Sequence, residues 1–128
     1  MTGPIDYSPR LLDHFENPRN VGLLEDADGV GLAGNPACGD RLELSLRIRD
    51  GRISEARFRA SGCTAAIASG SIVTVMMTGL ALDDVAAITD ADVAEALGGL
   101  PPARVHCSVL AQEAIRAALD HYRSRRKE

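Results

Sequence analysis

The segment from Arg41 to Arg49 alternates between polar and apolar side chains without a break. A period of two places the leucines and Ile48 on one face of a β-strand and the arginines on the other, so one face is buried and the other meets water. Asp50-Gly51 follows at once, and this dipeptide favours a type I′ hairpin turn. The chain must therefore form an antiparallel hairpin whose apolar face needs covering.

The return strand is expected from Arg52 to Ala60. Its apolar residues from Ala56 onward share one face, whereas Ile53 has the opposite parity. We therefore expect a bulge near Ser54-Glu55, because an extra residue restores the register of the buried face.

Helical patterns surround this hairpin. Small and apolar residues on nearly all sides indicate a buried helix at 64–78, and an apolar stripe indicates a long final helix at 107–125. The architecture predicted is α+β: a small antiparallel sheet with helices packed on one face and a long C-terminal helix, in a single domain spanning 1–128. The remaining expected elements are a helix at 9–15, a loop at 19–36 with a short strand near 30–33, and short helices near 82–87 and 90–97, the second capped by Thr89 and Asp92.

The chain contains three cysteines, Cys38, Cys63 and Cys107. An odd, small number of thiols without a Cys-x-x-Cys pair favours metal or sulfur chemistry over disulfides, zinc fingers or thioredoxin-like redox sites. Asp40 follows Cys38 by two residues and His106 precedes Cys107, so three thiolates and one oxygen or nitrogen ligand could hold zinc or an iron–sulfur cluster.

Two of these thiols are expected at helix starts. Cys63 opens the helix at 64–78 and Cys107 opens the final helix, where backbone N–H groups stabilise an anion. Both thiols should therefore ionise easily. The alternative at this point is that the cysteines are inert buried residues, since free cysteine is among the most buried residue types.

Composition excludes several other classes of protein. The net charge of −4 argues against general nucleic-acid binding. The start of the chain has no basic and apolar signal sequence, and no uncharged apolar run is long enough to span a membrane, so the reducing cytosol is the expected compartment. The segment from Gly29 to Gly34 matches G-x-G-x-x-G, but Asn35-Pro36 follows it instead of a helix, so we interpret these glycines as serving tight turns.

Four segments together resemble one family. Ala37–Asp40, Gly62–Ser69 and Leu100–Ser108 are similar to the three signature segments of iron–sulfur cluster assembly scaffolds, and Asp13–Gly22 is similar to their N-terminal segment. The family is that of IscU and the N-terminal domain of NifU. The resemblance covers the chain from Tyr7 to about Tyr122 and implies a SufE/IscU-like fold.

The resemblance implies a carrier rather than an enzyme that turns over a small molecule. Members of the family hold a transient 2Fe–2S cluster and pass it on. Carried onto this chain, the ligands are Cys38, Cys63 and Cys107, completed by Asp40 or His106. We expect Cys107 to accept the persulfide sulfur and Asp40 to be the exchangeable ligand, because a hard oxygen ligand binds iron less tightly than a thiolate does. The same groups would bind zinc.

The resemblance also implies partners. These are a cysteine desulfurase, a ferredoxin or similar electron donor, an iron donor, apo acceptor proteins and an Hsp70-type chaperone with its J-type partner. The chaperone would read the segment of Leu100, Pro101, Pro102, Ala103 and Arg104, where Arg104 replaces the usual lysine. The expected state is a monomer or weak homo-oligomer, without nucleic acid or membrane. The alternative is a zinc-bound sulfur acceptor of the SufU type, although the short interval between Cys63 and Cys107 lacks the insertion usual in that branch.

Overall fold

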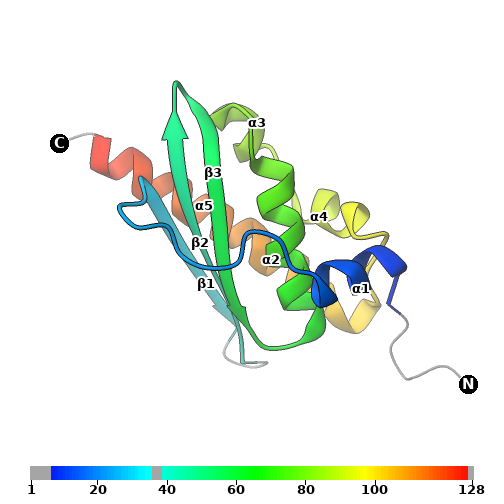
Figure 1. Cartoon of the computed structure of the whole chain (residues 1–128). Helices are drawn as coiled ribbons and strands as arrows, with labels where there is room; N and C mark the ends of the chain where they lie inside the picture. The colour runs from blue at the N-terminus through cyan, green and yellow to red at the C-terminus, as the bar shows by residue number, and fades with distance from the viewer. Residues whose placement is uncertain (1–6, 36–38, 127–128) are drawn as a thin grey trace, which may run out of the picture.

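The computed structural model describes residues 7–35 and 39–126, without the side chains of Asn35 and Arg126. Three strands and a set of helices form two layers, with the helices on one face of the sheet (Figure 1). In chain order the elements are α1 (Pro9–Glu16), β1 (Gly29–Asn35), β2 (Asp40–Arg49), β3 (Arg52–Ser61), α2 (Thr64–Met77), α3 (Leu82–Ala86), α4 (Asp90–Ala96), the 3₁₀ turn η1 (Pro102–Arg104) and α5 (His106–Arg126).

The sheet is antiparallel in the order β1-β2-β3, which confirms the predicted hairpin. Asp50 and Gly51 both have positive φ, as a type I′ turn requires. Arg47 pairs with Glu55 while Ile48 pairs with Ile53, so Ser54 is the extra residue. The bulge expected near Ser54-Glu55 is therefore confirmed, and it turns Ile53 toward the core.

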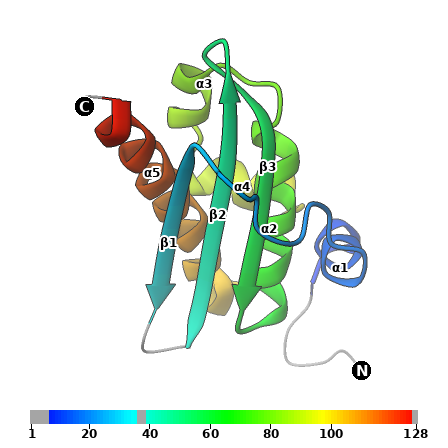
Figure 2. The same cartoon turned by 60° about the vertical axis from the view of Figure 1, so that its left-hand side comes forward.

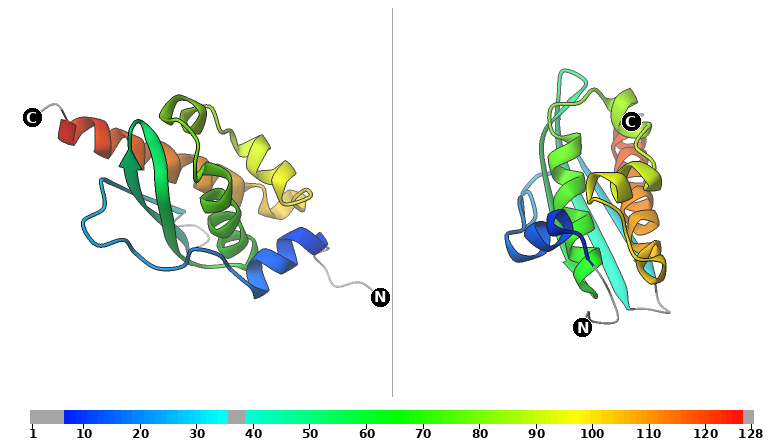
Figure 3. Two further views of the ribbon diagram at one scale, coloured as in Figure 1. Left: turned by 45° about the horizontal axis from the view of Figure 1, so that its top comes forward. Right: turned by 90° about the vertical axis from the view of Figure 1, so that its right-hand side faces the viewer.

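Helices α2 and α5 lie next to each other on the apolar face of the sheet, and α4 packs against both (Figure 3). The core between these layers is built from aliphatic side chains and Phe58, since the chain has no tryptophan. Helix α2 is buried along most of its length, as its small and apolar sequence predicts. The largest fully buried side chains include Leu42, Leu44, Leu46, Ile53, Phe58, Val73, Met77, Ile115 and Leu119.

Strand β1 is longer than the short strand expected near Val30–Ala33. Its glycines do not serve turns, so that interpretation is wrong. Gly29 and Gly31 face α5, and a Cβ added at Gly29 would lie 2.6 Å from the backbone oxygen of Ala118. Glycine is needed here because the strand and the helix backbone approach more closely than any side chain permits.

The N-terminal helix α1 is fixed to α2 by polar contacts. Ser8 caps α1 by accepting a hydrogen bond from the N–H of Leu11, and its hydroxyl also donates to the carbonyl of Leu97. His14 is buried, with Nδ1 2.7 Å from the hydroxyl of Ser71, which also accepts from the N–H of Arg19 at 2.9 Å. These contacts hold α1 beside α2, whose N-cap residue is Cys63.

The later helices agree with expectation apart from their ends. Thr89 and Asp92 form the reciprocal capping box predicted for α4. Helix α5 begins one residue earlier than expected, at His106, and ends at Arg126. Within residues 7–35 and 39–126, no helix has the length and apolar character needed to cross a membrane.

Candidate metal centre

Four of the predicted ligands meet at one end of the sheet. Asp40 begins β2, Cys63 is the N-cap of α2, and His106 and Cys107 open α5. These elements are far apart in sequence, but β2, α2 and α5 run in roughly the same direction, so their starts lie at the same end of the molecule (Figure 1). Cys38, the fifth residue assigned to the site, lies outside the described residues.

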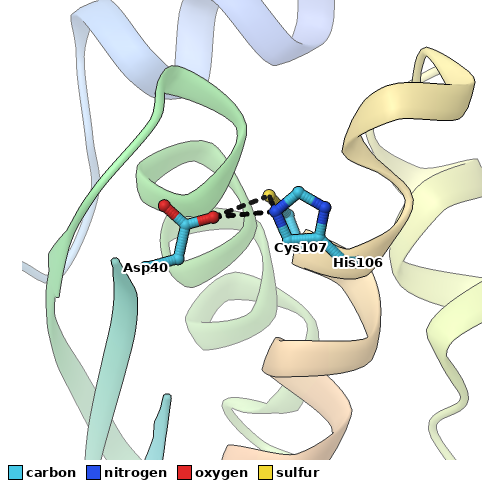
Figure 4. A group of neighbouring side chains, drawn as sticks. All are labelled: Asp40, His106 and Cys107. Carbon is cyan, nitrogen blue, oxygen red and sulfur yellow. Dashed lines mark hydrogen bonds and ion pairs between the residues drawn. The ribbon is translucent and has the colours of Figure 1, made fainter. Parts of the chain in front are cut away.

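The ligand atoms of these four side chains lie close together. Oδ2 of Asp40 lies 2.8 Å from Nε2 of His106, and the Sγ atoms of Cys63 and Cys107 are 3.4 Å apart. Each Sγ atom lies 3.7 Å from Oδ2 of Asp40. Ligand atoms of Asp40, His106 and Cys107 lie within 4.8 Å of one another, and their side chains point toward a common centre (Figure 4).

Asp40 is positioned by the turn that precedes α2. Its Oδ1 accepts a hydrogen bond from the N–H of Cys63 at 3.0 Å, and its side chain is nearly fully buried. Burial raises the pKa of the Asp40 carboxyl, but the hydrogen bonds from His106 and the Cys63 N–H outweigh this effect and leave the pKa below its usual value. Asp40 is therefore an anion ready to bind a cation.

Gly62 makes room for this carboxylate. Its φ is +125°, and an added Cβ would collide with Oδ1 of Asp40. Sequence reasoning placed Gly62 within a motif but did not assign it this task. The signal is a glycine directly before a cysteine that caps a helix, where positive φ and close approach to a side chain are both needed.

The two described thiols differ in accessibility. Cys63 is half-buried, whereas Cys107 is fully buried. Burial strongly raises the pKa of the Cys107 thiol, and the neighbouring Cys63 and Asp40 add to this effect. The expectation that Cys107 ionises easily at its helix start is therefore wrong for the metal-free protein, because burial and nearby negative charge outweigh the helix dipole.

A cation would reverse this balance. A metal ion bound by Asp40 would supply the positive charge that favours the thiolate, so metal binding would be coupled to proton release from Cys107. Two thiolates, a carboxylate and an imidazole are a donor set that suits zinc and iron–sulfur centres. The donor chemistry thus fits either kind of cargo.

The segment from Leu100 to Arg104 lies beside the site and ends in a 3₁₀ turn. Leu100 and Pro101 are half-buried, Pro102 and Ala103 are exposed, and Pro102–Arg104 form η1. A groove between this segment and the start of the chain is lined by Tyr7, Ser8, Pro9, Gly98, Gly99, Leu100, Pro101 and Pro102. The fixed φ of proline suits the first position of such a turn.

Arg104 forms a hydrogen bond with Tyr7 and interacts electrostatically with Cys63 and Cys107. The hydrogen bond with Tyr7 raises the pKa of the Arg104 guanidinium, desolvation opposes this rise, and the electrostatic interactions with the two cysteines support it. Sequence reasoning did not predict the contact with Tyr7, because no pattern links residues so distant along the chain.

Comparison with known proteins identifies the family. The model of the NifU-like N-terminal domain matches residues 6–128. The chain belongs to this family. The IscU-type resemblance seen in the four sequence segments is thereby confirmed, as is the α+β fold with its long C-terminal helix.

Named relatives are consistent with this family assignment. The iron–sulfur cluster assembly scaffold protein IscU 1 of Archaeoglobus fulgidus is 49% identical over 94% of this chain and 80% of its own length. The scaffold protein IscU of Escherichia coli K12 is 48% identical over 94% of this chain and 97% of its own. A crystal structure of the N-terminal part of a NifU-like protein from Brucella abortus has the same fold, with a TM-score of 0.75 at 19% identity over 91% of this chain and 94% of that one.

Proposed function

We propose that this NifU-like N-terminal domain is an IscU-type scaffold that assembles a 2Fe–2S cluster as cargo and transfers it to acceptor proteins. The observation that carries the proposal is the convergence of Cys63, Cys107, Asp40 and His106 at one end of the sheet, in a chain nearly half identical to named IscU scaffolds. Such a protein acts as a carrier. The cytosol is the compartment we propose.

The ligand set proposed is Cys38, Cys63 and Cys107, completed by Asp40 or His106. Asp40 and His106 share a hydrogen bond of 2.8 Å, so either could turn to the metal while the other supports it. We assign the exchangeable position to Asp40, because a carboxylate oxygen holds iron less firmly than a thiolate and one weak ligand aids release.

Sulfur would arrive from a cysteine desulfurase as sulfane sulfur, forming a persulfide on Cys107. Two electrons from a ferredoxin-type donor would then reduce that sulfur to sulfide and restore the thiol. Because Cys107 is fully buried, delivery to it requires a local opening of the site, whereas the half-buried Cys63 is reached more readily. Locating the added sulfur by mass spectrometry of cysteine-containing peptides after one desulfurase turnover would show whether Cys63 or Cys107 accepts it.

The remaining partners follow from the same function. An iron donor and apo acceptor proteins complete the cycle, and an Hsp70-type chaperone with its J-type partner would bind Leu100, Pro101, Pro102, Ala103 and Arg104. The exposed Pro102 and Ala103 support access to part of this segment. Stimulation of chaperone ATPase activity by wild type and by Arg104→Lys tests this assignment, and no stimulation by either protein would contradict it. The scaffold is proposed to be a monomer or weak homo-oligomer.

Anaerobic reconstitution tests the main proposal. Ferrous iron, cysteine and a cysteine desulfurase should produce visible charge-transfer absorption in wild type, and much less in Cys63→Ser. Asp83→Ala is the matched control, since this exposed carboxylate lies on α3 and away from the site. The second candidate is a zinc-bound sulfur acceptor, favoured because cysteine, histidine and aspartate side chains are the donors that zinc prefers. It would be supported if zinc persisted, no absorption developed and desulfurase turnover rose.

A further inference from the structure

The face of the sheet opposite the helices is only partly covered. Residues 20–28 cross this outer face, with the N–H of Leu24 donating to the Ser45 hydroxyl at 3.0 Å and Arg47 donating to the carbonyl of Glu25 at 2.7 Å. Figure 2 shows the crossing and, below it, bare strands toward the end where β2 begins. The uncovered part of the sheet therefore lies next to the candidate metal centre.

A hollow occupies this bare part. We call it the sheet hollow, and it is lined by Leu32, Arg41, Glu43, Arg59, Ala60 and Ser61. Its volume of about 220 Å³ is smaller than the ~300–1,000 Å³ of pockets for cofactors and drug-sized ligands. It can take one large side chain. Leu32 at its wall is 53% exposed although it is apolar, so the hollow offers an apolar surface to a partner.

The surroundings of the sheet hollow are positively charged. The lining of the sheet hollow carries two arginines, Arg41 and Arg59, against one acidic residue, Glu43, in a chain whose net charge is −4. Arg59 pairs with Glu43 at 3.0 Å, but Arg41 forms no ion pair within the described part of the chain. An anionic group from outside can therefore bind Arg41 without displacing an internal partner.

We propose that the sheet hollow docks a partner protein through an acidic surface that projects one apolar side chain. The apolar side chain would contact Leu32, and the acidic groups would surround Arg41. Arg41 directly follows Asp40, and Ser61 precedes Cys63 by two residues, so the bound partner would sit at the rim of the candidate metal centre. The proposal rests on the proposed scaffold function, because it places the partner beside the metal centre of the scaffold.

A second copy of this chain is the main competing occupant. No lysine or arginine lies between Arg59 and Arg104, and α3 and α4 carry the exposed acids Asp83, Asp84, Asp92 and Glu95. This acidic side of one molecule could face the sheet hollow of another. Sedimentation velocity over a range of protein concentrations tests this directly: a dimer that Arg41→Glu dissociates would overturn the proposal of a different partner.

The docking test uses a synthetic peptide of alternating Asp and Glu with one central Trp, titrated into the metal-free, isotope-labelled protein. We expect amide shifts in two-dimensional NMR spectra to cluster at Leu32, Arg41 and Ser61. Binding should weaken roughly three- to tenfold in Arg41→Glu, and also with rising salt, because the contact is electrostatic and exposed. Leu32→Ala should weaken binding of the Trp peptide but not of a Ser-substituted peptide.

Matched variants make the outcome decisive. Arg49→Glu makes the same charge change at the hairpin tip, and Leu23→Ala removes an exposed leucine of the crossing segment. Both should bind as wild type. Equal loss in Arg49→Glu, or equal binding of an oligonucleotide of the same net charge, would overturn the proposal. Since the assay uses metal-free protein, loss of peptide binding with intact cluster assembly is distinguishable from failure of the scaffold function.

Discussion

Replacing Gly31 by alanine should push β1 away from α5 and destabilise the whole domain. The added Cβ would lie 2.9 Å from Cα of Ala118, and nearer still to the backbone oxygen of Ala114 and the backbone nitrogen of Ala118. Ordinary contacts of a Cβ begin at 3.4 Å. All three neighbours are backbone atoms, which have no alternative rotamer, so strand and helix must separate.

The size of the effect follows from this rigidity. Overpacking costs typically 1–3 kcal/mol, and we expect about 3 kcal/mol here because no side chain can move aside. That is a large fraction of the ~5–15 kcal/mol that stabilises an ordinary domain. The midpoint of thermal unfolding should fall by roughly 10 °C.

Gly34→Ala is the matched control, since it makes the same change on the opposite face of β1. There the added Cβ meets nothing closer than 3.8 Å, and the alanine should change the free energy of unfolding by less than about 1 kcal/mol, in the stabilising direction. Urea unfolding followed by circular dichroism, with chelator and reductant present, measures both variants. A Gly31→Ala value within 0.5 kcal/mol of the control, about the size of a neutral surface change, would refute the argument.

Three further predictions concern the site and its support. Asp40→Ala should slow the release of a reconstituted cluster to a chelator, and faster loss would contradict its role as the exchangeable ligand. Gly62→Ala should displace the Asp40 carboxylate and weaken zinc binding by roughly tenfold in a competition titration, the usual effect of losing a supporting contact. Burial, aided by the charge of Arg19, lowers the pKa of His14. As the pH falls, the unfolded chain therefore binds a proton at this histidine before the folded protein does. The free energy of unfolding should decrease below pH ~6.5, by at most ~1.4 kcal/mol per pH unit. This slope, measured by urea unfolding at a series of pH values, should be smaller in His14→Gln than in wild type, and an equal slope would contradict the assignment to His14.

The hairpin was predictable because its signals are local. The alternation of Arg41–Arg49, the Asp50-Gly51 turn and the parity of Ile53 each depend on a few neighbouring residues. The glycines of β1 were misread because their reason lies on α5, more than eighty residues away in the chain. When a glycine is needed because the backbone of a distant segment packs against it, the residues next to it in the sequence do not reveal this.

The candidate metal centre was likewise predictable in part: its residues could be named from the sequence, but their environment could not. Residue types and motif resemblance assigned Asp40, Cys63, His106 and Cys107 to one site, and the structure places these four side chains beside one another. The high pKa of Cys107 could not be predicted, because it depends on burial by the assembled layers and on charges from other elements. Likewise, the contact between Tyr7 and Arg104 exists only after the start of the chain has docked against the segment before α5.

The absence of lysine and arginine between Arg59 and Arg104 has a practical consequence. Trypsin cleaves after these residue types, so a digest releases residues 60–104 as one long peptide that contains Cys63 and no other cysteine. Cleavage after Arg19, Arg41, Arg104 and Arg116 puts Cys38 and Cys107 on two further peptides. Each cysteine of this protein thus lies on a different tryptic peptide, so a single digest analysed by mass spectrometry can show which thiol carries a persulfide sulfur.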